Sequence, residues 1–281
     1  MTVTATHPMA KYFRSGIRYT SCPGCGNGII AQSILRAIDG IGESMDSYAF
    51  VSGIGCSGWI PSPAFGADLL HVTHGRSMAA ATGLKVALPD QKVILIQGDG
   101  DLSAIGGNHF IHACRRNIDL TVVCVNNGIY GMTGGQTAPT TPRDLVTATS
   151  PYGNIERSFD LSALAMAAGA TFVARWTTWQ ARQLTESIRK GILHPGFALI
   201  EVISQCPVQY GKAIGKRNDP VAMLDFYRTH SVPVKAAEKL SKEDLRDRIV
   251  VGELVCEEGV PEFTRELARL REEAAGDECE N

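Results

Sequence analysis

The sequence lacks any apolar run of the roughly 18 residues that a membrane-spanning helix needs, so we expect no transmembrane segment. Residues 1–11 lack a charged region followed by an apolar stretch, so no secretory signal peptide is predicted. The chain also lacks a large charge of either sign, because its net charge is only −2. A nucleic-acid or anionic-membrane partner is therefore not expected. Together these absences predict a cytoplasmic globular protein.

The composition is that of a protein with a buried core. The chain has 281 residues, of which 44% are hydrophobic and 20% are charged, as in ordinary globular proteins. This length suits one large domain or two small ones. The eight cysteines point to metal ligation or buried thiols rather than disulfides, because the cytoplasm is a reducing compartment.

Short runs rich in Val, Ile and Leu alternate with helical stretches through the first two thirds of the chain. The predicted strands are 48–52, 93–97, 120–125, 171–174 and 198–203. The predicted helices are 28–38, 75–88, 108–116, 161–168 and 179–191. Such alternation indicates an α/β fold, with a mostly parallel sheet and helices on both faces. Ligands of these sheets bind outside the carboxyl ends of the strands, so we searched there for chemistry.

This regularity fades after about residue 207. Residues 210–219 are rich in Gly and Lys and read as a loop. Residues 241–244 resemble the start of a helix, with Ser as the N-cap and acids in the first turn. The last stretch, 256–281, is dense in Glu and is predicted to be a solvated helix followed by a frayed tail.

Polar residues follow two of the predicted strands. Strand 93–97 is followed by Gly-Asp-Gly-Asp at 98–101, and strand 120–125 is followed by Asn-Asn-Gly-Ile-Tyr at 126–130. Asp99 and Asn127 are 28 positions apart, which is one helix plus one strand. The crossover should therefore return both side chains to the same edge of the sheet.

These residues suit a magnesium ion bound to a diphosphate. Mg²⁺ prefers oxygen ligands, and Asp99, Asn127 and the carbonyl of Ile129 could supply three of them. The neighbouring glycines would let backbone N–H groups approach phosphate oxygens. Gly-Asp-Gly alone is also a common turn sequence, but the Asn-Asn pair one strand later favours the metal site. The combined pattern is similar to the thiamine diphosphate fingerprint of thiamine-dependent enzymes.

Four cysteines are predicted to gather at the same edge. Cys22 and Cys25 form a Cys-x-x-Cys in a loop rich in Gly and Pro, whereas Cys56 and Cys206 each follow a strand. Four thiolates could hold a zinc ion or a [4Fe–4S] cluster, and their spacing does not choose between the two. The other cysteines look like buried hydrophobes or have no cysteine neighbour: Cys114, Cys124, Cys256 and Cys279.

Taken together, the motifs closely resemble the β subunit of 2-oxoacid:ferredoxin oxidoreductases over residues 19–215. The matching blocks are Cys22–Gly26, Gly53–Gly58, His71–Arg76, Gly98–Asp101, Asn126–Gln136 and Cys206-Pro207. Residues 126–143, with Met132, look more like the 2-oxoglutarate branch than the pyruvate branch. Branched-chain and aryl 2-oxoacid enzymes share much of this region, so those substrates remain alternatives.

The resemblance implies a thiamine diphosphate-binding fold of the pyrophosphate type. It implies Mg²⁺ on Asp99, Asn127 and Ile129, and it decides the metal of the cysteines in favour of a [4Fe–4S] cluster. The cluster ligands would be Cys22, Cys25, Cys56 and Cys206. His74 would be the side chain nearest the chemistry. The residues expected to line the cofactor are Ile54, Gly55, Cys56, Ser57, His74, Gly98, Gly100, Asp101, Tyr130, Gly131, Met132 and Thr133.

The resemblance also implies a reaction and partners. The enzyme would decarboxylate 2-oxoglutarate to succinyl-CoA and CO₂ with coenzyme A, passing electrons through the cluster to ferredoxin, or would run in reverse and fix CO₂. In this class a glutamate from a second, pyrimidine-binding domain activates thiamine. We predict one thiamine domain at 1–215 and an extension with an acidic tail at 216–281, so an α subunit must supply the second domain, in an α2β2 complex.

Two readings outside this family remain open from the sequence. A non-redox thiamine-dependent decarboxylase or carboligase would keep the metal site and give the cysteines a structural role. A regulator that binds a nucleotide or metal without catalysis would also use glycine-rich loops at strand ends. A bound iron–sulfur cluster would distinguish the redox enzyme from the decarboxylase or carboligase. Bound thiamine diphosphate would distinguish either enzyme from the regulator.

Overall fold

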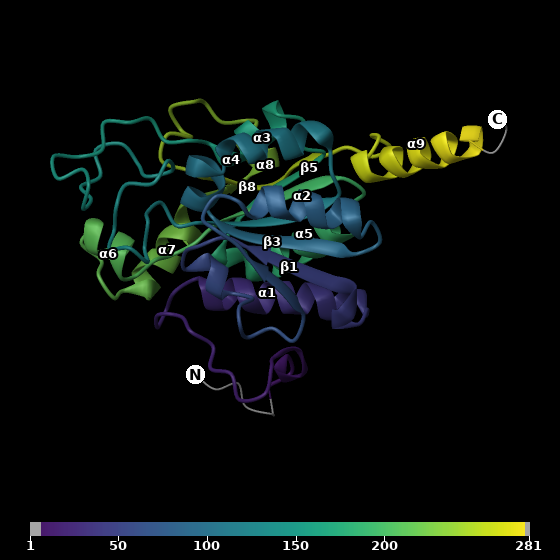
Figure 1. The fold of residues 1–281 in the computed structure, drawn as a ribbon. Helices are drawn as coiled ribbons and strands as arrows, with labels where there is room; N and C mark the ends of the chain where they lie inside the picture. Colours follow the sequence, from purple (N-terminus) through teal and green to yellow (C-terminus); the bar gives the residue numbers. More distant parts are fainter. Residues whose placement is uncertain (1–6, 279–281) are drawn as a thin grey trace.

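The computed structural model describes residues 7–278. These residues form a mostly parallel sheet of eight strands with helices on both faces, so the predicted fold class is confirmed (Figure 1). The strands lie in the order β2-β1-β3-β4-β6-β5-β8-β7. Their bounds are β1 Tyr48–Ser52, β2 Asp68–His71, β3 Lys92–Gly98, β4 Leu120–Asn126, β5 Phe172–Thr177, β6 Phe197–Ile203, β7 Ser231–Pro233 and β8 Ile249–Cys256.

Helices separate most of these strands. Their bounds are α1 Asn27–Ile41, α2 Ser77–Ala87, α3 Gly107–Arg116, α4 Leu161–Ala167, α5 Ala181–Leu193, α6 Gln209–Ala213, α7 Pro220–His230, α8 Val234–Ala237 and α9 Phe263–Glu278. All five predicted strands and all five predicted helices are present, with ends displaced by at most three residues. No helix within residues 7–278 is both long enough and apolar enough to cross a bilayer.

Apolar side chains that alternate along the strands fill a core on each face of the sheet. On one face, α1 and α5 pack over Phe50 and Ile94. On the other face, α2, α3 and α4 cover Val51 and Leu95. Because both faces are covered, the central strands read as continuous apolar runs, which is why the sequence revealed them.

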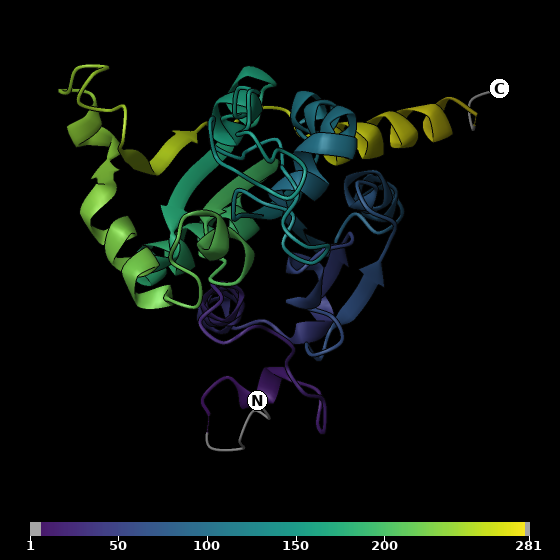
Figure 2. The ribbon, with the colours of Figure 1, turned by 90° about the vertical axis from the view of Figure 1, so that its left-hand side faces the viewer.

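Three predictions for the second half of the chain need correction. Residues 210–219 are not all loop, because the short helix α6 begins at Gln209. Residues 241–244 form a turn rather than a helix. The cap itself is present, since the Asp244 N–H donates to Ser241 Oγ at 3.1 Å, but β8 begins at Ile249 and leaves room for little more than one turn of helix. Finally, Cys256 ends β8, and α9 starts only at Phe263 and projects from the body of the protein (Figure 1, Figure 2).

Strand β8 ties the end of the chain to the main sheet. It pairs antiparallel with β5, with a bulge between Val173 and Ala174, and β7 pairs with it in turn. The short edge strand β2 was also not predicted, because Asp68–His71 is largely exposed and lacks an apolar run. The division of the chain at residue 215 stays a prediction. Cys279 and the last residues of the acidic tail lie outside the described residues.

The register of the parallel strands brings four loops to one edge. Ser52 of β1 pairs with Ile96 of β3, and Gly98 of β3 pairs with Val125 of β4. Asn126, the last residue of β4, pairs with Ile203 at the end of β6. The loops that follow β1, β3, β4 and β6 therefore start side by side at the carboxyl edge.

A buried ion pair joins two strands and one of these loops. Arg175 of β5 lies opposite Glu201 of β6, and its Nε donates to Glu201 Oε2 at 2.8 Å. Glu201 is only 2% exposed, and it also accepts from Ser162 Oγ at 2.6 Å and from Asn126 Nδ2 at 2.8 Å. Glu201 thus holds the side chain of Asn126 at the end of β4.

Replacing Glu201 should destabilise the fold. In Glu201→Gln the Arg175 charge keeps only Asp160 as an acidic partner, so we expect a loss of about 3 kcal/mol in the free energy of unfolding. Urea unfolding followed by circular dichroism would measure it. The matched control, Glu186→Gln, removes a solvent-exposed partner of Arg189 on α5 and should leave the midpoint unchanged. Equal effects in the two variants would contradict this account.

Candidate functional site

A pocket of about 520 Å³ opens at the carboxyl ends of β1, β3 and β4. Its walls come from the loop after β1, the turn before α2, the turn after β3 and the long loop after β4. Every residue that the sequence analysis assigned to the cofactor or to Mg²⁺ lines it: Ile54, Gly55, Cys56, Ser57, His74, Gly98, Asp99, Gly100, Asp101, Asn127, Ile129, Tyr130, Gly131, Met132 and Thr133. Gln136, Thr137 and Thr149 line it as well and were not predicted.

Asp99 is a buried carboxylate in the wall of this pocket. Asp99 is 3% exposed, its carboxylate accepts a hydrogen bond from the Thr140 hydroxyl, and nearby backbone N–H groups, among them those of Gly100 and Asn127, favour its ionised form. Burial nevertheless raises the pKa of Asp99 to about 6, because these donors only partly replace water. A bound cation would compensate the buried charge and restore the ionised form.

Asn127 lies directly beside this carboxylate. Its side-chain oxygen accepts from the Ile129 N–H at 3.1 Å, which forms a tight turn through Gly128. Gly128 has φ of +70°, a left-handed conformation that favours glycine. The turn therefore keeps Asp99, Asn127 and Ile129, the three predicted magnesium ligands, next to one another.

A second buried carboxylate, Asp101, holds the turn that carries His74. Asp101 Oδ1 accepts from the Gly75 N–H at 2.6 Å, and Oδ2 accepts from Gln97 Nε2 at 3.0 Å. His74 Nδ1 lies 2.8 Å from the Ile54 carbonyl and 3.2 Å from Asp101 Oδ1. Both neighbours are acceptors, so Nδ1 carries a proton, and in the neutral form Nε2 would be left to accept.

The four predicted cluster cysteines come together beside the pocket. The Sγ atoms of Cys56 and Cys206 each lie 3.6 Å from where a Cβ on Gly131 would be. Burial raises the pKa of Cys56 to about 11, and the charges of Cys25, Cys206 and Cys22 add to the rise. The loops are joined by a hydrogen bond of 3.1 Å from the Gly26 N–H to the Gln205 carbonyl. We call the group formed by Cys22, Cys25, Cys56 and Cys206 the cysteine corner. Ionising these thiols costs free energy unless a cation lies among them.

The remaining cysteines behave differently. Cys114 and Cys124 are fully buried in the core, as predicted, whereas Cys256 is exposed. Within residues 7–278 no three His, Cys, Asp or Glu side chains converge closely enough to hold one metal ion between them.

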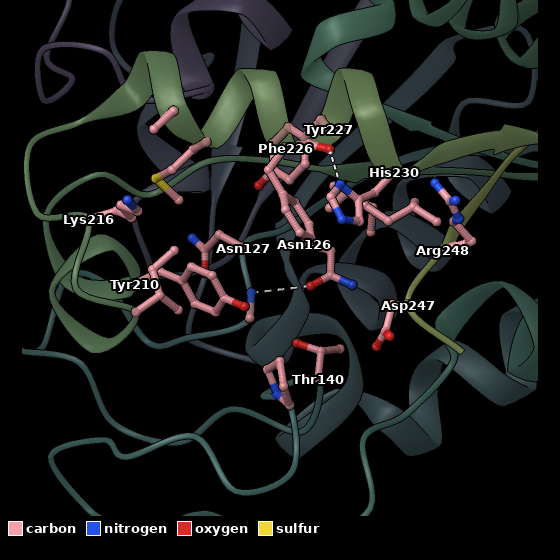
Figure 3. A pocket seen from close by; sticks show the side chains of 17 residues that line it. Asn126, Asn127, Thr140, Tyr210, Lys216, Phe226, Tyr227, His230, Asp247 and Arg248 are labelled. Atoms are coloured by element: carbon pink, nitrogen blue, oxygen red, sulfur yellow. Dashed lines mark hydrogen bonds between the residues drawn. The ribbon is translucent and has the colours of Figure 1, made fainter. Parts of the chain in front are cut away.

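A second pocket, of about 810 Å³, lies at the carboxyl ends of β4 and β6 (Figure 3). Aromatic side chains of α6 and α7 form much of its wall, and Lys216 and Arg248 stand at its border. It shares Asn127 with the first pocket, and it also includes Thr140, the residue that donates to Asp99. The sequence analysis missed it, because nothing in the pattern after residue 207 linked these segments to β4.

Comparison with known proteins agrees with this geometry. The family model described as "Thiamine pyrophosphate enzyme, C-terminal TPP binding domain" matches residues 48–202. The 2-oxoglutarate synthase subunit KorB of Methanocaldococcus jannaschii is 52% identical over 95% of this chain and 98% of its own length. The 2-oxoacid:ferredoxin oxidoreductase subunit beta of Saccharolobus solfataricus is 38% identical over 88% of this chain and 85% of its own length.

A solved structure gives the same result. It is the 2-oxoglutarate:ferredoxin oxidoreductase of Magnetococcus marinus, with 2-oxoglutarate, coenzyme A and succinyl-CoA bound. A chain of that structure matches with a TM-score of 0.84 and 33% identity, over 96% of this chain and 92% of its own length. The sequence and the fold thus agree over nearly the whole of each chain, and the chain belongs to the family of 2-oxoacid:ferredoxin oxidoreductase β subunits, where it resembles the 2-oxoglutarate branch.

Proposed function

We propose that this chain is the β subunit of a 2-oxoglutarate:ferredoxin oxidoreductase. One 2-oxoglutarate, one coenzyme A and two oxidised ferredoxins would give succinyl-CoA, CO₂, two reduced ferredoxins and a proton, and the reverse reaction would fix CO₂. The observation that carries the proposal is the position of four cysteines beside a pocket floored by Asp99 and Asn127. With thiamine diphosphate and a cluster bound, this arrangement would put the site of decarboxylation beside the group that accepts the electrons.

The residues of the first pocket fit thiamine diphosphate and Mg²⁺. The carboxylate of Asp99, the amide of Asn127 and the carbonyl of Ile129 are oxygen donors of the kind that Mg²⁺ prefers. Asp99 also needs a cation, because its burial without one raises its pKa. Gly98 and Gly100 expose backbone N–H groups to a diphosphate. Gly100 must stay glycine, since a Cβ there would meet the Tyr130 ring at 2.3 Å.

Thiamine diphosphate, when bound, supplies the electron sink for the loss of CO₂ from a 2-oxoacid. The chain's own part is to hold and orient. His74 offers Nε2 as an acceptor at the pocket rim, and its ring lies 5.9 Å from the ring of Tyr130. Tyr130 in turn lies with its hydroxyl 3.4 Å from the Gly100 carbonyl. Both aromatic groups therefore lie beside the Gly98–Asp101 turn, which would hold the diphosphate.

The cysteine corner fits a [4Fe–4S] cluster better than one zinc ion. Four thiolates could hold either group, but a redox cluster beside thiamine has a use in electron transfer that a zinc ion lacks. A four-iron cluster spreads its thiolates over separate irons. The raised pKa values of Cys25 and Cys56 also call for a cationic group among them. Cys22, Cys25, Cys56 and Cys206 would be the ligands.

The proposal requires a partner chain. Residues 7–278 contain one sheet, and the family model that matches it is that of a single thiamine-binding domain. We propose that an α subunit adds the pyrimidine-binding domain and coenzyme A contacts, in an α2β2 complex that works in the cytoplasm. The choice of 2-oxoglutarate over pyruvate, branched-chain or aryl 2-oxoacids rests on the names of the relatives and on the segment around Met132, which lines the pocket and is 46% exposed.

Asp99→Asn should weaken binding of thiamine diphosphate with Mg²⁺ at least about tenfold, or about 1.4 kcal/mol, because the metal loses its one charged ligand. Calorimetry on the complex with the partner subunit would measure this. Asp144→Asn is the control, since Asp144 is an exposed aspartate on the long loop after β4. Unchanged binding in Asp99→Asn would sink the assignment.

The affinity for Mg²⁺ measured by this calorimetry should depend on pH. The pKa of Asp99 is raised to about 6 in the folded chain, above about 3.9 in the unfolded chain, so the ionised form opposes folding. Without metal, the stability that Asp99 contributes should fall as pH rises through this interval. Binding of Mg²⁺ needs the carboxylate ionised, so affinity should rise towards pH 6 and then level off. A pH-independent affinity from pH 5 to 7 would contradict this.

Anaerobically purified protein should show a broad visible iron–sulfur band that dithionite bleaches. Cys206→Ser should lose most of that band, whereas Cys256→Ser, which alters an exposed cysteine at the end of β8, should keep it. Zinc in place of iron, with no visible band, would favour the non-redox thiamine enzyme instead.

A panel of 2-oxoacids, assayed with coenzyme A and a viologen dye on the assembled complex, would test the substrate. We expect the highest kcat/KM for 2-oxoglutarate and no reduction without coenzyme A. Activity on pyruvate with none on 2-oxoglutarate would overturn the substrate assignment while leaving the family intact.

A further inference from the structure

Three exposed cations lie close together in sequence after the fourth cysteine. Lys212 is in α6, and Lys216 and Arg217 follow in the segment that leads to α7. All three side chains are exposed, and none takes part in an ion pair within the described part of the chain. The nearest acid in sequence, Asp219, is occupied in capping α7 through the Ala222 N–H at 2.9 Å. We call residues 211–220, which carry these three cations, the basic loop.

The backbone of the basic loop is folded onto the cysteine corner. The Gly211 N–H donates to the Cys206 carbonyl at 2.8 Å, and the Asn218 N–H donates to the Pro207 carbonyl at 2.8 Å. Just beyond, Pro220 packs against Gly24, between Cys22 and Cys25, so closely that a Cβ on Gly24 would meet the proline ring at 2.5 Å. This segment therefore covers loops that carry three of the four cysteines.

Apolar side chains are exposed among these charges. Ile214 is 39% exposed, and Val221, in the first turn of α7, is 73% exposed. Lys216 also borders the second pocket, whose wall includes Ile214 and Phe226 (Figure 3). Exposed apolar groups ringed by unpaired cations next to a concave surface are typical of a site that contacts another protein.

Electron transfer weakens steeply with distance, so a protein that takes electrons from the cysteine corner must dock against it. Cys22 is the exposed cysteine of the four, and Pro220, at the end of the basic loop, packs on Gly24 in the same Cys-x-x-Cys loop. Unpaired cations there would attract an acidic surface, speed its encounter and repel a basic one.

We infer that Lys212, Lys216 and Arg217 form the docking surface for a small acidic one-electron carrier protein of the ferredoxin class. This inference rests on the proposed function. Each 2-oxoacid releases two electrons, so two oxidised carriers must dock, take one electron each and leave in every turnover. A contact made mainly by exposed charges suits this exchange, because it raises the rate of association without requiring slow release.

The triple variant Lys212→Glu/Lys216→Glu/Arg217→Glu would test the surface in the complex with the partner subunit. We expect the apparent KM for a purified acidic ferredoxin to rise about tenfold or more at low ionic strength. Salt should shrink the difference between variant and parent, since the screening length falls from ~30 Å at 0.01 M to ~8 Å at 0.15 M. The kcat with methyl viologen, which needs no protein docking, should stay within about twofold of the parent value.

Lys235→Glu/Lys239→Glu/Lys242→Glu is the matched control, because it makes the same change in charge on exposed lysines of α8 and the following turn. It should leave the KM for ferredoxin near the parent value. Equal effects of the two triple variants would overturn the docking surface, as would an unchanged ferredoxin KM in the first. Loss of the partner subunit on purification of the first would show that the basic loop is a subunit contact instead. No viologen reduction by the parent complex would remove the proposed function itself, and this inference with it.

Discussion

The site depends on one electrostatic constraint, which is the negative charge of Asp99. This carboxylate is buried at the carboxyl end of β3, and it takes part in no ion pair within residues 7–278. A hydroxyl and backbone N–H groups satisfy it only in part, so its pKa stays raised. A buried charge that the chain itself does not neutralise is what a cation site requires before the cation binds.

Two further buried carboxylates keep the loops around Asp99 in place. Asp101 fixes the turn at Gly75 and, with it, the ring of His74. Glu201 fixes Asn126, the residue before Asn127, and is itself balanced by Arg175. Both oxygens of each of these two carboxylates accept hydrogen bonds from the chain, whereas burial of Asp99 outweighs its donors and raises its pKa. That difference separates groups that hold the structure from the group that would bind a ligand.

The cysteine corner, like Asp99, gathers buried groups whose ionised forms need a positive charge nearby. Cys25 and Cys56 are partly buried, and their pKa values are raised by burial and by the neighbouring thiols. Two sites that each need positive charge thus lie on either side of Gly131, which is near the Sγ atoms of Cys56 and Cys206 and also lines the first pocket. Gly131 therefore lies where the two sites meet. This proximity is the physical basis of the proposal that decarboxylation is coupled to electron transfer.

Much of this arrangement followed from local signals in the sequence. Strands such as Ile94 to Ile96 are apolar because helices cover both of their faces, and the turns after β3 and β4 carry Gly-Asp-Gly and Asn-Asn, which supply oxygen donors and backbone N–H groups. The Cys-x-x-Cys loop is likewise a local signal. These features depend on neighbours in the chain, so the order of residues determined them.

Other features depend on contacts between distant segments, and only the tertiary structure decided them. Thr140 donates to Asp99 from 41 positions away, and Glu201 reaches Asn126 across 75. Strand β8 is found only through its pairing with β5, since edge strands need no long apolar run. The basic loop looks like an ordinary solvated stretch until Gly211 and Asn218 anchor it on Cys206 and Pro207. Sequence alone determined which groups are present, whereas packing decided which of them lack a partner.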